Sequence, residues 1–275
     1  MSWTVRRLDL TDLDACLDLG TDREWPLEDH KWRLLFSIGR VYGIDDPDGG
    51  LAAVVVGAPY GSDVNAISMM LVSRKQARKG LGTQVLSHAL ADVDAKSALL
   101  TATPMGKPLY EKLGFRSVGL CSTVRGTPAS PIAPSGRSRP FTAADLPAVT
   151  ALDTDVFGAP RTELIAALPE FCDTFRVVDG PDGVIAFGGA WPNVGTTVLG
   201  PVTAPDPETA IALLDDLAAA SPGVLRLDVD HRAPHVLRWA EQAGLEHRFT
   251  VDVMVLGPYE TGDPRSHTPV MLALG

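Results

Sequence analysis

The alternation of apolar and polar positions along the chain predicts an α/β protein. Short apolar runs with β-branched residues are typical of strands, and they occur at 3–8, 51–57, 67–72, 98–101 and 117–124. Between two of these runs, Leu81, Val85, Ala89 and Val93 recur at every fourth position, which is the spacing of a helix with one apolar face. Turns rich in Asp and Gly separate the first strands.

One junction between a predicted strand and a predicted helix carries chemistry. The strand 67–72 is followed by the sequence Arg-Lys-Gly-Leu-Gly-Thr at 78–83, where the helix begins. Glycine lets a backbone approach a ligand closely, and the first N–H groups of a helix have no internal partner and carry positive charge. A basic turn at this place predicts an anion site that suits a pyrophosphate. The alternative is an ordinary tight turn with solvated Arg78 and Lys79, because the motif is neither a P-loop nor a three-glycine dinucleotide fingerprint.

Downstream, residues 109–115 have the sequence Leu-Tyr-Glu-Lys-Leu-Gly-Phe. Together with the basic glycine turn, this motif resembles the GNAT N-acetyltransferase superfamily, and the resemblance covers most of residues 1–126. It implies acetyl-CoA as cosubstrate, with the pyrophosphate at the turn and the pantetheine along the preceding strand. The implied cofactor-binding residues are Met70, Leu71, Val72, Arg78, Lys79, Gly80, Leu81, Gly82 and Thr83.

The resemblance also implies a role for Tyr110 as the general acid that protonates or hydrogen-bonds the leaving thiolate. A phenol with an ordinary pKa near 10 is protonated at neutral pH and can serve in this way. The alternative is a tyrosine that only packs on an amphipathic helix. Two positions depart from the family pattern: Ala77 stands where Arg or Gln is usual, and Thr103 stands where Asn is frequent.

The segment after the first predicted helix resembles the helical lid that covers the acceptor substrate in this family. Glu24, Trp25 and Trp32 are therefore expected at an acceptor pocket, although both tryptophans could instead be packing residues. The general base is left open among Asp22, Glu24 and His30.

Residues 127–137 are dominated by Pro, Ser, Gly and Ala without periodicity, which indicates a linker. It divides the chain into an N-terminal catalytic domain, 1–126, and a C-terminal domain, 138–275. The second domain repeats the first, since 139–146 resembles 6–13. We therefore expect two tandem GNAT-like domains, each a central mixed β-sheet flanked by helices.

The second copy has lost the chemistry of the first. Gly244 matches Gly114, which gives a shift of 244 − 114 = 130 residues. At this shift the replacements remove the glycines, the charge and the phenol: Ala210 for Gly80, Ala212 for Gly82, Glu208 for Arg78 and Ala240 for Tyr110. The C-terminal domain is therefore expected to be degenerate, without a working cofactor site.

One further cluster, Asp228-Val229-Asp230-His231, is expected on a strand of the second domain. Asp228 and Asp230 would share one face, because side chains alternate along a strand. Three interpretations stay open: a metal site, an acceptor pocket lined by Asp230, or a hydrogen-bonded structural cluster. We expect no bound metal.

Composition narrows the function. The chain of 275 residues has 24 basic and 34 acidic side chains, a net charge of −10, which argues against nucleic-acid binding. Its three cysteines are scattered, as in reduced cytoplasmic proteins, and no apolar run approaches the length of a membrane span. We expect a cytoplasmic N-acetyltransferase, monomeric or homodimeric, that transfers an acetyl group to a primary amine of a small molecule. The alternatives are a non-catalytic acyl-CoA-binding regulator and a protein-lysine or N-terminal acetyltransferase.

Overall fold

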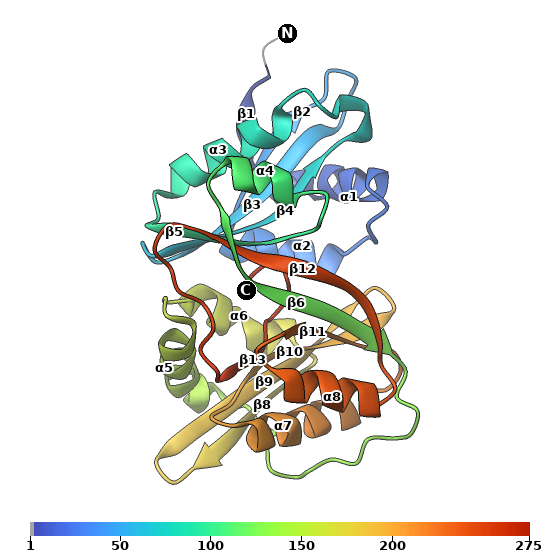
Figure 1. Cartoon of the computed structure of the whole chain (residues 1–275), viewed down its shortest axis with the longest axis vertical. Coiled ribbons are helices and arrows are strands. Elements are labelled where there is room, and N and C mark those ends of the chain that lie inside the picture. Colours follow the sequence, from blue (N-terminus) through green and yellow to red (C-terminus); the bar gives the residue numbers. More distant parts are fainter. Residues whose placement is uncertain (1–2) are drawn as a thin grey trace.

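The computed structural model describes residues 3–275, and its centre is one mixed sheet of 13 strands that both halves of the chain build (Figure 1). The first half contributes β1 (Val5–Leu8), α1 (Leu13–Asp22), α2 (Asp29–Ile38), β2 (Arg40–Asp45), β3 (Leu51–Tyr60), β4 (Val64–Val72), α3 (Leu81–Val93), β5 (Ser97–Ala102), α4 (Lys107–Lys112) and β6 (Arg116–Gly126). The second half contributes β7 (Arg139–Pro140), α5 (Leu146–Phe157), α6 (Thr162–Phe171), β8 (Thr174–Gly180), β9 (Gly183–Asn193), β10 (Thr196–Thr203), α7 (Pro207–Ala219), β11 (Leu225–Asp230), α8 (Pro234–Gln242), β12 (Glu246–Leu256) and β13 (Ser266–Thr268). Three short 3₁₀ helices complete the fold: Leu10–Asp12, Arg74–Gln76 and Ala143–Asp145.

The two halves exchange strands at the centre of the sheet. The strand order is β1-β2-β3-β4-β5-β12-β6-β11-β10-β9-β8-β7, with β13 added beside β10. Strand β12, near the end of the chain, lies antiparallel between β5 and β6, and β6 in turn pairs with β11. From the sequence we expect a sheet in each half. The structure joins the two sheets into one, because each half supplies a strand to the other.

Helices cover both faces of this sheet (Figure 1). Apolar residues of α3 and α4 pack on one face of the first half, and those of α7 and α8 pack on the second half. On the opposite face, α1, α2, α5 and α6 share one apolar core that crosses from half to half. Within it, Phe171 stacks on His30 at 4.3 Å between ring centroids and lies 5.0 Å from the ring of Trp191. The two halves are thus packed together as well as hydrogen-bonded together.

A buried ion pair fixes the second half against the end of the chain. Arg161 and Asp153 are 6% and 1% exposed, and two hydrogen bonds of 3.0 and 2.6 Å join them. Arg161 also donates to the carbonyl of Gly275 at 2.9 Å and lies over the ring of Phe157. Removing one member of such a pair leaves the other charge buried without a partner.

We therefore expect Asp153→Ala to lower the free energy of unfolding by about 3–5 kcal/mol, measured by urea denaturation. The matched control is Asp29→Ala, which breaks an exposed pair with Arg33 and should cost less than about 1 kcal/mol. Equal losses in the two variants would contradict a structural role for the buried pair.

Candidate functional site

Strands β4 and β5 begin as neighbours and then separate. Their parallel register runs only from Val64–Ser97 to Ala66–Leu99. Beyond that point β4 stays with β3, while β5 stays with β12. We call the opening between residues 67–72 and 100–102 the wedge. Met69 has a left-handed φ of 47° at an irregularity in the β3–β4 register, and such bulges bend a strand.

The wedge contains a buried polar group without a partner. The Ser68 hydroxyl oxygen is buried and has no hydrogen-bond partner among residues 3–275. Ser68 is 8% exposed and lies two positions beyond the last β4–β5 pair. Buried polar groups in native proteins are almost always paired, so this hydroxyl is an exception, together with the Asn65 side-chain oxygen and the Thr268 hydroxyl. The predicted residues Met70, Leu71 and Val72 follow Ser68 along the same edge.

The start of α3 is open, as the basic turn predicts. Gly80 precedes the helix with a left-handed φ of 80°, and no side chain caps the helix. The first amide that bonds back is Gln84, which donates to Gly80 at 3.0 Å. The N–H groups of Leu81, Gly82 and Thr83 therefore have no partner within the helix and carry the positive end of its dipole.

Gly82 lies where α3, α4 and the wedge meet. An added Cβ would come 3.4 Å from side-chain carbons of Leu109 and Val72 and 3.6 Å from the sulfur of Met70. A longer side chain would fill the space between the helix start and the wedge. Glycine at this position keeps the space at the start of α3 continuous with the wedge.

Acidic neighbours hold the loop before α3 in place. Arg74 pairs with Glu24, and Lys75 pairs with Asp48. Arg78 and Lys79, in contrast, form no ion pair with any residue from 3 to 275. The Lys79 ammonium donates to Gln76 at 2.6 Å. No carboxylate among the described residues neutralises these two cations, so both are available to bind an anion at the helix start.

Tyr110 lies in α4 and is 7% exposed. Its ring contacts Phe115 edge to face, at 6.0 Å between centroids, and its hydroxyl has no hydrogen bond to the rest of the described chain. Burial raises the pKa of the phenol to about 12. Lys107 ties α4 to the exchanged strand β12 through a 2.7 Å ion pair with Asp252. The second half of the chain therefore helps to position the tyrosine of the first.

The other predicted site residues are scattered. Trp32 is 2% exposed in the shared core, whereas Trp25 is 38% exposed beside Lys31. Glu24 lies on the surface and pairs with Arg74. The structure does not bring these three residues together with Asp230.

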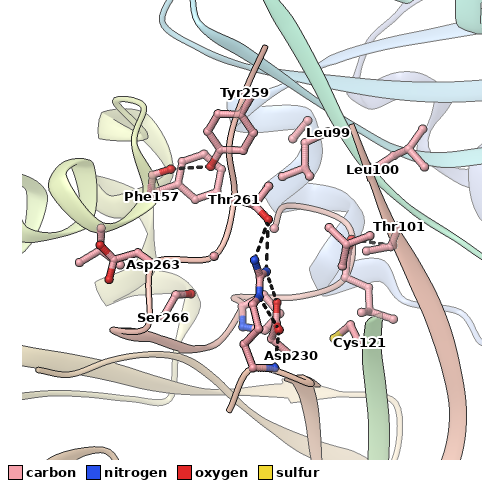
Figure 2. A pocket seen from close by; sticks show the side chains of 18 of the residues that line it. Leu99, Leu100, Thr101, Cys121, Phe157, Asp230, Tyr259, Thr261, Asp263 and Ser266 are labelled. Carbon is pink, nitrogen blue, oxygen red and sulfur yellow. Dashed lines mark hydrogen bonds and ion pairs between the residues drawn. The ribbon is translucent and has the colours of Figure 1, made fainter. Parts of the chain in front are cut away.

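Asp230 instead lines a cavity under the centre of the sheet (Figure 2). We call it the central cavity; it lies between β5, β6, β12 and the C-terminal segment 257–275. Residues that the sequence did not suggest form much of its lining, among them Phe157, Tyr259 and Arg232. They come from three distant segments, and no periodicity or spacing connects them. Asp230 is the lining residue that the sequence suggested for an acceptor pocket, because it belongs to an acidic cluster on a predicted strand.

The start of α7 differs from the start of α3. The helix begins at Pro207, and Asp206 caps it by accepting from the Thr209 amide at 2.8 Å. Proline has no N–H to offer, and the Glu208 carboxylate pairs with Arg137 at 2.8 Å. Carboxylates thus occupy the helix start where an anion would bind.

This geometry corrects the alignment made from the sequence. The helix starts differ by 207 − 81 = 126 residues, not by 130. Asp206, rather than Ala210, is therefore the counterpart of Gly80. The error is about one helical turn, and it arose because the shift was set at Gly114 and Gly244, beyond a connection of different length.

The second wedge is also filled by the chain itself. Strands β10 and β11 are parallel neighbours only at Thr197–Leu225 and Val198–Arg226. Beyond this point β13 pairs with β10, at Val202–Thr268 and Thr203–Ser266. A segment of protein thus takes the place that stays open between β4 and β5.

Asp228 belongs to a structural network. It is 2% exposed, accepts from the Thr123 hydroxyl at 2.6 Å and pairs with Arg226.

Within residues 3–275, no group of three or more His, Cys, Asp or Glu side chains is arranged to hold a metal ion. Across the same residues, no helix is long and apolar enough to cross a membrane.

Comparisons with known proteins agree with this geometry. Two family models, each described as an acetyltransferase (GNAT) domain, match residues 52–133 and 149–267. An uncharacterized N-acetyltransferase of Bacillus subtilis (strain 168), YitH, is 27% identical over 221 residues, which are 77% of each chain.

Solved structures share the whole fold. A putative acetyltransferase from Pyrococcus horikoshii superposes with a TM-score of 0.84 at 16% identity, over 99% of this chain and 96% of that one. A tandem GNAT protein from the clavulanic acid biosynthesis pathway superposes with a TM-score of 0.66 at 11% identity, over 94% of this chain and all of the other. With a match in each half of the sequence and this shared architecture, the chain belongs to the GNAT acyltransferase superfamily, as a member with two GNAT domains in tandem.

Proposed function

We propose that the protein is an N-acetyltransferase whose first half transfers an acetyl group from acetyl-CoA to a primary amine of a small molecule. The observation that supports this most strongly is the contrast between two helix starts. The start of α3 offers free amides behind Gly80, whereas Asp206 and Pro207 close the start of α7. Only the first can bind a pyrophosphate.

The residues of the first half fit acetyl-CoA. The amides of Leu81, Gly82 and Thr83, with the charges of Arg78 and Lys79, would hold the pyrophosphate. The main chain at 70–72 would hold the pantetheine along the wedge and polarise the thioester carbonyl.

In the transfer, the amine nitrogen attacks the thioester carbon, so that a C–N bond forms and the C–S bond breaks. The bonding electron pair goes to sulfur, and the proton lost by nitrogen ends on the thiol. With a pKa of about 12, Tyr110 is a weaker acid than an ordinary thiol, whose pKa is near 8.5. Tyr110 therefore acts by donating a hydrogen bond to the departing sulfur, and full transfer of its proton is unfavourable.

The same site would also suit an acyl-CoA-binding regulator without turnover, or an enzyme that acetylates proteins. The small volume of the central cavity, about 80 Å³, favours a small acceptor over a protein chain. We place the protein in the cytoplasm, where Cys16, Cys121 and Cys172, all buried and unpaired, would stay reduced.

Release of free thiol from acetyl-CoA, followed with a panel of small primary amines, tests the proposal. Amine-dependent release supports a small-molecule acetyltransferase. Tight binding of acetyl-CoA with no release by any amine would instead indicate a regulator. Mass spectrometry of a lysate treated with the enzyme and acetyl-CoA would detect acetylated proteins if the acceptor is a protein.

We expect calorimetry to give one acetyl-CoA per chain, because the second helix start is capped and the second wedge is filled by β13. The control variant Asp206→Ala removes the cap and should cost about 1 kcal/mol of stability. It should still bind one cofactor, since β13 and Pro207 remain. Two equivalents bound to the natural protein would contradict the assignment.

A further inference from the structure

The central cavity adjoins the wedge. Its lining includes Ala66 and Leu99, which form the last β4–β5 pair before the strands separate. Its volume is about 80 Å³, and it is partly open to solvent, so it suits only a small molecule. A molecule bound here would lie beside the place where the thioester is expected.

The walls of this cavity are largely apolar. Leu99 and Val253 come from the sheet, and Leu272 comes from the C-terminal segment. The rings of Phe157 and Tyr259 stand 5.6 Å apart at an interplanar angle of 34° (Figure 2). The two rings pack on each other, and Arg161 lies over the Phe157 ring, so they add to the apolar wall.

The charged side chains that line the cavity are already paired. Asp230 accepts from the main-chain amide and the Nε of Arg232, each at 2.8 Å, and Arg232 also reaches Thr261 (Figure 2). Asp263 accepts from Arg265 at 2.9 and 2.7 Å. Gly275 also lines the cavity, and Arg161 donates to its oxygen at 2.9 Å. Each acidic side chain among the described lining residues is thus already held by a neighbouring arginine.

The lining also lacks a free base. The Nδ1 of His267 is 3.0 Å from the Nε2 of His235, and its Nε2 is 3.1 Å from the carbonyl oxygen of Ala204. Both ring nitrogens are therefore engaged. Burial raises the pKa of the Cys121 thiol, which keeps it protonated. An amine that arrives charged would find nothing here to take its proton.

We propose that the central cavity is the acceptor site and that it takes a primary aromatic amine, which enters in the uncharged form. This inference rests on the acetyl transfer proposed above. Burying an unpaired ammonium is costly, whereas an aromatic amine is uncharged at neutral pH and already has the lone pair that attacks the thioester. The nitrogen loses its proton only as the C–N bond forms, so no separate base is required.

The first part of the test compares three amines with the full-length protein and acetyl-CoA: aniline, benzylamine and putrescine. At pH 7 we expect kcat/KM for aniline to exceed that for putrescine by at least about a hundredfold. Between pH 6 and 8 the rate with aniline should be flat. The rate with benzylamine should rise about tenfold per pH unit, because only its uncharged fraction reacts.

The second part fills the cavity. Ala273 lines it from the C-terminal segment and is partly exposed, so Ala273→Trp adds bulk without opening the core. We expect kcat/KM for aniline to fall at least about tenfold, with an unchanged Kd for acetyl-CoA by calorimetry. The matched control, Ala148→Trp on the exposed face of α5, should change neither quantity.

Three results would overturn this inference alone: faster turnover of putrescine than of aniline, an unaffected rate with aniline in a folded Ala273→Trp variant, or weakened acetyl-CoA binding in that variant. The last would show that the cavity holds the acyl group. Failure of the natural protein to bind acetyl-CoA, or to acetylate any amine, would instead contradict the proposed function, and this inference would fall with it.

Discussion

Thr83→Asp should abolish acetyl-CoA binding and leave the fold at least as stable as before. Thr83 is exposed at the third position of α3. A carboxylate there stabilises a helix by about 0.3–1 kcal/mol through the dipole. It would also stand against the pyrophosphate. Repulsion between charges about 4 Å apart near a protein surface amounts to about 4 kcal/mol, so we expect Kd to rise by at least about a hundredfold.

The control is Thr83→Asn, which has nearly the same shape without the charge and should keep Kd within about threefold. Calorimetry measures the affinity, and thermal denaturation shows that neither variant is unfolded. Because Asp206 and Glu208 place carboxylates at the start of α7, the variant gives the start of α3 a comparable negative charge. Equal affinities of the Asp and Asn variants would remove the pyrophosphate from this helix start.

Local patterns made much of the first half predictable. The apolar run before the glycines became β4, the four-residue spacing from Leu81 became α3, and the turn at 45–50 became the β2–β3 connection. Each of these elements depends on residues that are close in sequence. The glycine pair also marked a helix start that no side chain caps and that Gly80 enters with a left-handed φ, because glycine favours that conformation.

Contacts between distant segments could not be predicted in this way. Nothing in residues 246–256 shows that they lie between two strands of the first half, because any strand of suitable pattern could fill that place. The ion pair between Lys107 and Asp252 follows from this exchange. Arg232 and Tyr259 also reach the central cavity only because segments distant in sequence lie together in the fold. The candidate acceptor site therefore depends on the tertiary structure, whereas the candidate cofactor site depends on a continuous motif.

The same distinction explains the alignment error in the second half. The shift was set at Gly114 and Gly244 and carried back to the helix starts, across loops of unequal length: 94–96 between α3 and β5, and 220–224 between α7 and β11. The constant shift was therefore wrong by about one turn of helix at the start of α7. The expectation of a degenerate second site was based on Ala210 and Glu208, whereas the structure places Asp206 and Pro207 at the helix start and β13 beside β10.

Tyr110→Phe should lower kcat by about a hundredfold, within the range for loss of one hydrogen-bond donor to a developing negative charge, without changing acetyl-CoA affinity or stability. The hydroxyl has no hydrogen-bond partner within residues 3–275, so its removal breaks no bond of the folded chain. Burial raises the pKa of Tyr110 to about 12, which favours the protonated form. The donor is thus lost only as the pH rises towards 12, and activity should show no alkaline decline from this group below about pH 11.

The matched control is Tyr42→Phe in the same apolar core. The Tyr42 hydroxyl donates to Asp92, so this variant should lose about 1 kcal/mol of stability and keep its kcat. Thiol release under saturating acetyl-CoA and amine measures the rate, and urea denaturation measures stability. Tyr110→Phe should therefore lower kcat and leave stability unchanged, whereas Tyr42→Phe should lower stability and leave kcat unchanged. Full kcat in Tyr110→Phe, or a fall in kcat matched by Tyr42→Phe, would show that the phenol of α4 only packs.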